Sequence, residues 1–190
     1  STLSPATMTR FVHLHVHTEY SLVDGVVRID SEHADDGKLV REGLVDACAR
    51  LGMPAVAVTD QGNLFALVKF YRAAMARGVK PLVGVDLLLH EEGERAEPSR
   101  LVLLCQDERG YANLTRLVTR SYLEGQGRHG PTGQRACLDR GTTEGLVALS
   151  GARDGDVGRA LLTGHEDEAA RALDDWLKLF GDRYYLELTR

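Results

Sequence analysis

The sequence predicts an α/β fold built around a mostly parallel β-sheet. Short apolar runs alternate along the chain with longer segments whose apolar residues recur at helical spacing. This alternation is typical of strand-helix-strand units, in which successive strands lie parallel. With 190 residues, 43% of them hydrophobic, the chain is long enough to bury a core and fits one domain or slightly more.

Six short apolar segments are predicted to form strands, because each is bounded by turn residues or by a helical pattern. They are residues 11–18, 54–60, 80–89, 100–106, 145–150 and 183–189. The chain stops directly after the sixth, where a parallel architecture would ordinarily continue. We therefore expect an incomplete domain, cut before its last strand or strands.

Four segments with an apolar stripe at helical spacing are predicted to form helices. They are residues 38–52, 64–78, 110–125 and 165–181. The first two close on Gly52 and Gly78, which suit the left-handed conformation that often follows a helix. Trp176 and Phe180 lie on the apolar stripe of the last helix, which predicts core packing for both. Two irregular segments, 27–38 and the glycine-rich 125–145, are expected to be surface excursions.

Composition excludes several classes of function. A net charge of −5 provides no general positive potential for a phosphate backbone, so DNA is not expected as a direct partner. Three scattered cysteines without a C-x-x-C pair predict neither a disulfide framework nor a cysteine zinc site, which favours a reducing cytoplasm. No run approaches the roughly 18 apolar residues of a membrane span, so no membrane association is expected. Met8 can be the native start, which makes residues 1–9 a disordered or added tail.

The segment HLHVHTEYSLVDG contains candidate functional residues at the end of the first predicted strand. His13, His15 and His17 alternate and therefore share one face, and Asp24 follows in the next loop. Asp86 stands inside the apolar third strand, where a buried carboxylate needs a cation, a metal ion or several hydrogen bonds. Imidazole and carboxylate ligands suit zinc, manganese or iron. The alternative is a hydrogen-bonded polar cluster that holds no ion.

Asp60 follows the second predicted strand in the motif TDQGN. Its position before a helix favours the orientation of a turn over a catalytic role. The chain lacks both the G-x-x-x-x-G-K-[ST] phosphate loop and the G-x-S-x-G elbow, which removes the commonest nucleotide-binding and acyl-transfer interpretations.

Six ordered stretches carry a resemblance to a known family. They are FVHLHVHTEYSLVDG, GMPAVAVTDQGNLFALVKFY, GVKPLVGVDLLL, LVLLCQDERGYANLTRL, EGLVALSGARDGDVGRALL and DRYYLELTR. Together they resemble the PHP (polymerase and histidinol phosphatase) domain, in the form found at the amino terminus of bacterial DNA polymerase III alpha subunits. The resemblance covers residues 10–190 and implies a distorted TIM-like (β/α) barrel, incomplete at its C-terminal end.

Members of this family that bind metal hold a cluster of ions at the barrel mouth and hydrolyse phosphate esters. Carried over by position, the resemblance implies that His15, His17 and Asp24 match ligands of the first motif. Asp86 stands where the family has a glutamate, so it can still ligate but reaches one methylene less far.

At three other positions the family's ligands are replaced. Gln61 stands in place of the histidine of T-D-H-G-N, Arg100 in place of a histidine, and Ala152 in place of a cysteine or histidine. Arginine stays protonated and cannot ligate a metal. We therefore expect a degenerate site that needs no cofactor, although a residual zinc, manganese or magnesium ion can remain. Arg100 is expected to place its charge near Asp24 or Asp86.

The resemblance implies a structural and protein-docking role within a replicative polymerase, whose nucleotidyl-transfer centre lies far downstream. The implied partners are the rest of the alpha subunit and the proofreading exonuclease (epsilon) subunit, with DNA met only through the parent protein. The first alternative is a surviving metal-dependent phosphoesterase or 3′–5′ exonuclease that uses His15, His17, Asp24 and Asp86. A stand-alone phosphatase of the histidinol-phosphate type is the second.

Overall fold

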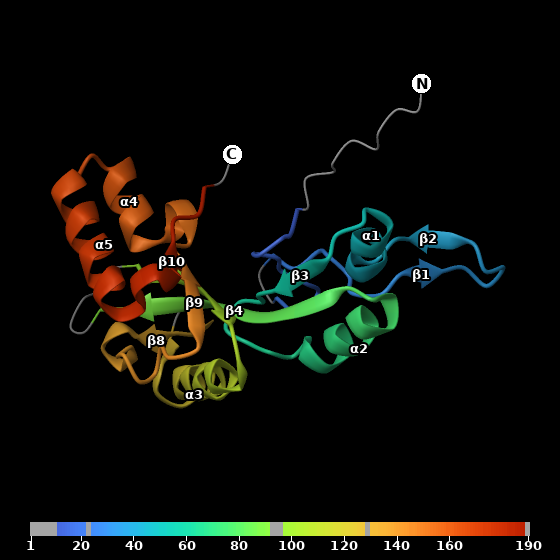
Figure 1. Ribbon diagram of the computed structural model, residues 1–190, viewed down its shortest axis with the longest axis horizontal. Coiled ribbons are helices and arrows are strands. Elements are labelled where there is room, and N and C mark those ends of the chain that lie inside the picture. The colour runs from blue at the N-terminus through green and yellow to red at the C-terminus, as the bar shows by residue number, and fades with distance from the viewer. Residues whose placement is uncertain (1–10, 22–23, 92–96, 128–129, 189–190) are drawn as a thin grey trace, which may run out of the picture.

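The computed structural model describes residues 11–21, 24–91, 97–127 and 130–188, and shows a mixed α/β fold. The long strand β4 (Lys80–His90) crosses the middle of the molecule, between a half that contains the first helices and a half that contains the last ones (Figure 1). The predicted tail at residues 1–9 lies outside the described residues.

The main sheet follows the order β10-β9-β5-β4-β3, with β8 also paired to β4. The other strands of this sheet are β3 (Ala55–Val58), β5 (Ser99–Cys105), β8 (Gly133–Gln134), β9 (Leu146–Leu149) and β10 (Tyr184–Tyr185). β3 is parallel to β4 and β10 to β9, but β5 is antiparallel to both of its neighbours. The prediction of a mostly parallel sheet is therefore wrong at β5. Only residues 91–98 separate β4 from β5, and a parallel crossover needs a dozen residues or more.

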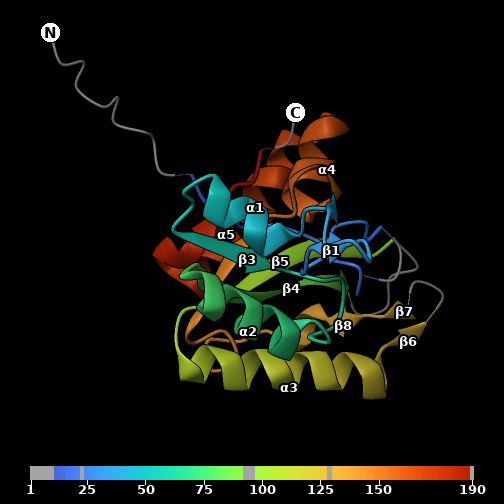
Figure 2. The same ribbon diagram turned by 90° about the vertical axis from the view of Figure 1, so that its right-hand side faces the viewer.

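The described residues contain five α-helices: α1 (Leu44–Arg50), α2 (Leu67–Arg77), α3 (Glu108–Glu124), α4 (Asp156–Leu162) and α5 (Glu166–Phe180). Helices α2, α3 and α5 confirm three predicted helices, and α4 was not predicted. Gly78 closes α2 with a φ of 69°, in the left-handed region. The Asp107 side chain caps α3 by accepting a hydrogen bond of 2.8 Å from the Gly110 N–H. Helices α2 and α3 both lie below β4 in the two views (Figures 1 and 2).

The predicted helix at residues 38–52 is wrong in its first half. Residues Leu39–Arg41 form strand β2, which pairs with β1 (Glu32–His33) in an antiparallel hairpin. The reason lies at Gly43, where a Cβ atom would come within 2.6 Å of backbone atoms of residues 29–31. This close backbone approach holds the chain extended up to Gly43, so the helix starts only at Leu44.

The predicted first strand, residues 11–18, is not a regular strand. Thr18 makes only an isolated bridge, to Val27. The segment nevertheless follows β3: the His13 carbonyl accepts a hydrogen bond of 2.8 Å from the Ala57 N–H, and the Val16 carbonyl accepts one of 2.9 Å from the Thr59 N–H. Because the Val16 N–H donates to the Thr59 hydroxyl instead of a carbonyl, the ladder is interrupted there. The segment therefore extends the sheet at the β3 end.

The glycine-rich segment 125–145 is only partly a surface excursion. Besides β8 it contains two more short strands, β6 (Gln126–Gly127) and β7 (Gly130–Pro131). Thr132 and Thr143 within it are buried, and β8 pairs with the end of β4. The segment thus closes one side of the core, which corrects the prediction.

In the part of the chain that the structure describes, the core consists of two large clusters and one small one. The largest joins β4, β5 and β9 to α3, α4 and α5, and it contains Trp176 and Phe180 as predicted. The second joins β3 to α1 and α2. The third is a small apolar patch on the main sheet, formed by Ala57, Val102, Leu104 and Leu149. Within the described residues, no helix is long and apolar enough to span a bilayer.

Candidate functional site

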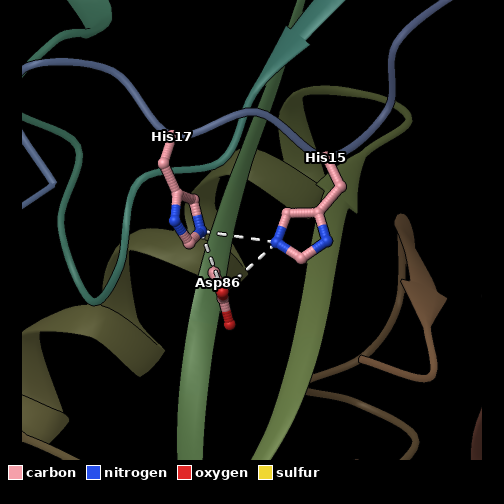
Figure 3. Close-up of side chains that lie close together, drawn as sticks. All are labelled: His15, His17 and Asp86. Atoms are coloured by element: carbon pink, nitrogen blue, oxygen red, sulfur yellow. Dashed lines mark hydrogen bonds and ion pairs between the residues drawn. The ribbon is translucent and has the colours of Figure 1, made fainter. Parts of the chain in front are cut away.

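Asp86 is the centre of the candidate site. It lies on β4, which is paired on both sides, and its side chain is fully buried. His15 and His17 approach it from the segment beside β3 (Figure 3). The His15 Nε2 and His17 Nε2 atoms lie 3.2 and 2.9 Å from the same oxygen, Asp86 Oδ2, and 3.3 Å from each other. The alternation read from the sequence therefore does bring these two histidines to one point.

A third cation reaches the same oxygen. Arg100, on the neighbouring strand β5, places Nη1 3.2 Å from Asp86 Oδ2. The register explains this contact, because Arg100 pairs with Leu88, two residues from Asp86 on the same face of β4. The expectation that Asp86 meets a cation, and that Arg100 supplies one, is confirmed.

Each histidine ring is held between two carboxylates. His15 Nδ1 lies 2.6 Å from Glu187 Oε1, and His17 Nδ1 lies 2.8 Å from Asp24 Oδ1. A carboxylate oxygen only accepts, so each of these contacts requires a proton on the ring nitrogen. Two imidazolium rings and Arg100 then face three carboxylates, and the charges of the cluster balance.

The pKa values of the cluster follow from these contacts. Burial alone would lower the pKa of His15, but hydrogen bonds and charge from Asp86 and Glu187 outweigh burial and raise it to about 9. The pKa of His17 is also raised, because Asp86 and Asp24 outweigh its burial. Burial would raise the pKa of Asp86, but the two histidines and Arg100 keep it below its usual range.

Of the other predicted ligand positions, Gln61 and Ala152 lie beside this cluster without joining it, and Asp24 joins it only through its bond to the His17 ring. The backbone of Gln61 forms an isolated bridge with Asp86. Ala152 opens a short 3₁₀ helix with a φ of 49°, next to Gly151, which packs on the Arg100 backbone. Asp24 is half-exposed and lies on the far side of the His17 ring from Asp86.

Two further residues near the site have structural roles. His13 is exposed and contacts the Phe11 ring edge-on at 4.7 Å, so it does not join the other histidines. Asp60 is buried and accepts hydrogen bonds from the Thr18 N–H at 2.6 Å and the Thr18 hydroxyl at 2.8 Å. Burial raises the pKa of Asp60. These bonds orient the turn at Thr18, whereas the prediction placed this role of Asp60 at the turn that follows β3.

Glu187 is the member of the cluster that the sequence analysis missed. It follows β10 and is separated from His15 by 172 positions. The signal was available: Glu187 is a carboxylate inside the otherwise apolar run Tyr-Tyr-Leu-Glu-Leu, which is the same pattern that identified Asp86.

Once the protons on the Nε2 atoms of His15 and His17 are lost, the donors present suit a single ion. The ligand atoms of His15, His17 and Asp86 all lie within 4.8 Å of one another, and this is the one such group of three among the described residues. Asp86 Oδ1 is buried without a hydrogen-bond partner there, so one more oxygen remains available. Three protein ligands can hold a zinc ion that keeps an open position. A second or third ion would lack ligands, because Arg100 and Ala152 offer none.

Comparison with known proteins identifies relatives of this chain. The PHP domain profile matches residues 13–190. The chain is 46% identical over 180 residues to the DNA polymerase III subunit alpha of Pseudomonas aeruginosa, and 41% identical over 181 residues to that of Escherichia coli K12. The Vibrio cholerae subunit is 40% identical over 181 residues. In each case the match covers 95% of this chain.

The chain spans 14% of the length of these three relatives. Among solved structures, an amidohydrolase from Chromobacterium violaceum with bound sulfate and no metal is 20% identical, covering 60% of this chain and 34% of its own. Its TM-score of 0.43 is too low for a structural inference. The described strands form an open sheet and not a closed barrel. The profile match and the sequence identities show that this chain belongs to the PHP domain family.

Proposed function

We propose that this chain is the PHP domain of a bacterial DNA polymerase III alpha subunit, where it acts as a structural and protein-docking module. The sequence identity of 40–46% to alpha subunits over 95% of the chain supports this assignment. The observation that carries the structural role is the contact between Arg100 and Asp86, which supplies a permanent positive charge at the centre of the site. The cluster balances its charges with protein groups alone.

The proposal includes a distorted TIM-like barrel that further strands complete. Its support is the curvature of the sheet, since Glu187 after β10 reaches His15 beside β3, at the other end of the strand order. The remainder of the alpha subunit is the first partner, and the proofreading exonuclease (epsilon) subunit is the second. Contact with DNA is made through the parent protein, in the cytoplasm.

Docking is tested with the purified chain and the purified epsilon subunit of the same replicase. Isothermal titration calorimetry should show saturable binding that persists in excess EDTA, because the contact does not depend on an ion. The alternative outcome, no heat of binding at any accessible concentration, contradicts the docking role of this domain.

A residual metal-dependent phosphoesterase or 3′–5′ exonuclease is the second candidate, favoured by the convergence of His15, His17 and Asp86. In that case those three residues would hold one zinc, manganese or magnesium ion, which would supply a hydroxide at neutral pH. A missing supporting residue typically costs about 10- to 100-fold in metal affinity or activity, and here ligands themselves are replaced.

Elemental analysis of protein purified without chelator separates the two candidates. The structural proposal expects far less than one transition metal ion per chain and no release of phosphate or nucleotide. Stoichiometric zinc or manganese that disappears in the variant His15→Ala/His17→Ala, together with hydrolysis lost in the same variant, would establish the second candidate. The variant His13→Ala is the matched control, since His13 is exposed and does not join the other two histidines.

A further inference from the structure

Two segments at opposite ends of the strand order face each other in this fold. Residues 11–17 lie beyond β3, to which they are joined by the hydrogen bonds at His13 and Val16. Residues 184–188 contain β10, at the other end of the main sheet. Strands β9, β5, β4 and β3 therefore separate these two segments along the sheet, although both approach the same cluster.

A large apolar cavity lies between the two segments. Its volume is about 700 Å³, and its floor is the sheet. The floor residues are Leu82, Leu104, Val147 and Leu149, while Phe11 and Leu14 line one side and Tyr185 and Leu188 the other. Apolar contact across so wide a space is weak, so the two sides need another attachment.

The hydrogen bond between His15 and Glu187 is that attachment. Its length is 2.6 Å, and the two side chains are only 21% and 15% exposed. Among the described residues it is the one hydrogen bond between residues 11–18 and residues 184–188. A charge-assisted bond of this kind is about twice as strong as a neutral one.

The backbone of Glu187 is itself anchored to the sheet. The Glu187 N–H donates to the Ser150 hydroxyl at 3.0 Å, and the Ser150 N–H donates to the Tyr185 carbonyl at 3.0 Å. Ser150 is buried at the end of β9. The second carboxylate oxygen, Glu187 Oε2, is buried without a hydrogen-bond partner in the described structure, so the burial of Glu187 relies on His15.

We propose that Glu187 is a positioning residue and that its bond to His15 is a latch that holds the two end segments together across the apolar cavity. The bond fixes the His15 ring through Nδ1 and directs Nε2 at Asp86. Asp24 holds His17 in the same way, but from seven residues away in the same loop, so it joins no distant parts of the chain. This inference does not depend on a role in replication.

Three variants test the latch: Glu187→Ala removes it, Glu187→Gln keeps an oxygen that can accept from Nδ1, and Asp24→Ala removes the equivalent local bond. Amide hydrogen exchange is followed by NMR at Val16 and Glu187, one on each side of the cavity. The latch predicts that exchange at both amides rises by about 10-fold or more in Glu187→Ala. Glu187→Gln should restore most of the protection, and Asp24→Ala should leave Glu187 unchanged.

The ring nitrogens of His15 give a second readout that simple packing would not change. The ¹⁵N signal of His15 Nδ1 should shift in both Glu187 variants and stay in place in Asp24→Ala. If the alanine variant does not fold, the glutamine variant alone must still shift this signal. Unchanged ring signals, faster exchange at Glu187 without any at Val16, or an equal effect of Asp24→Ala on both amides would overturn the proposal.

Discussion

At the scale of single residues, Asp86 is buried with three donors on one oxygen. The free-energy cost of burying its charge is offset by these contacts, since an unpaired carboxylate in the interior is strongly unfavourable. Arg100 is the one donor of the three that cannot lose its proton. It therefore keeps a positive charge beside Asp86 at every pH at which the protein is folded.

Replacing Arg100 tests this role. Arg100→Ala should lower the free energy of unfolding by about 1–3 kcal/mol, because a buried acceptor loses a charged donor. Arg100→Lys keeps the positive charge but not the planar guanidinium group, and should lower the free energy of unfolding by less. The measurement is urea unfolding followed by far-UV circular dichroism, with Arg140→Ala as the control at an exposed position. An alanine variant as stable as the wild type would show that the two histidines suffice.

At the scale of elements, Arg135 fastens the glycine-rich segment to the helices. Its guanidinium lies 3.7 Å from the centre of the Trp176 ring, and its Nη1 lies 2.7 Å from Asp156 Oδ2. Trp176 Nε1 donates to the same carboxylate at 2.9 Å, and Tyr184 stacks on Trp176 with ring centres 5.9 Å apart. This arrangement explains why part of a segment with so many glycines is buried.

Fluorescence can follow that contact, because Trp176 is the only tryptophan in the chain. Arg135→Ala should expose one face of the ring, shift its emission to longer wavelength and reduce stability by about 1–2 kcal/mol. Asp156→Asn keeps an acceptor for Trp176 Nε1 and should shift the emission less. An emission maximum that stays at the wild-type wavelength in Arg135→Ala would mean that the other contacts of the segment, such as β8 and the hydrogen bond from Asn113 to the Gly141 carbonyl, suffice to hold it in place.

At the scale of the whole molecule, β4 connects the two large core clusters. Val85, Leu87 and Leu89 of β4 belong to the cluster around α3, α4 and α5, while its neighbour β3 carries Val56 and Val58 of the cluster around α1 and α2. Two paired strands that each carry one of the clusters favour unfolding as one unit. The two clusters are therefore expected to lose structure together.

The alkylation of two cysteines, Cys48 and Cys105, tests this expectation. Burial raises the pKa of Cys48, and burial together with the charge of Asp107 raises that of Cys105 to about 12. Because the thiolate is the reactive form, Cys105 should alkylate about 1,000-fold more slowly than a free thiol at pH 8, and about tenfold faster for each added pH unit. Peptide mapping by mass spectrometry after iodoacetamide treatment in increasing urea should give one midpoint for both residues. Reaction of Cys48 at clearly lower urea would show that the halves unfold separately.

The sequence by itself determined most of the element types and the family. Apolar periodicity located five of the main strands and three of the helices, and the H-x-H pair and Asp86 identified the site, because side-chain alternation and the cost of a buried charge are local properties. Periodicity failed at residues 38–52, where Gly43 packs against a distant backbone, since such a contact leaves no trace in the spacing of apolar residues.

Only the tertiary structure decided the direction of β5 and the membership of the charge cluster. The antiparallel turn into β5 depends on how the chain returns after β4, and the bond between His15 and Glu187 joins residues 172 positions apart. The spacing of residue types along the sequence carries information only about contacts within a single helix or strand. Contacts across a folded sheet depend instead on its curvature and strand order, which emerge only when the whole core packs.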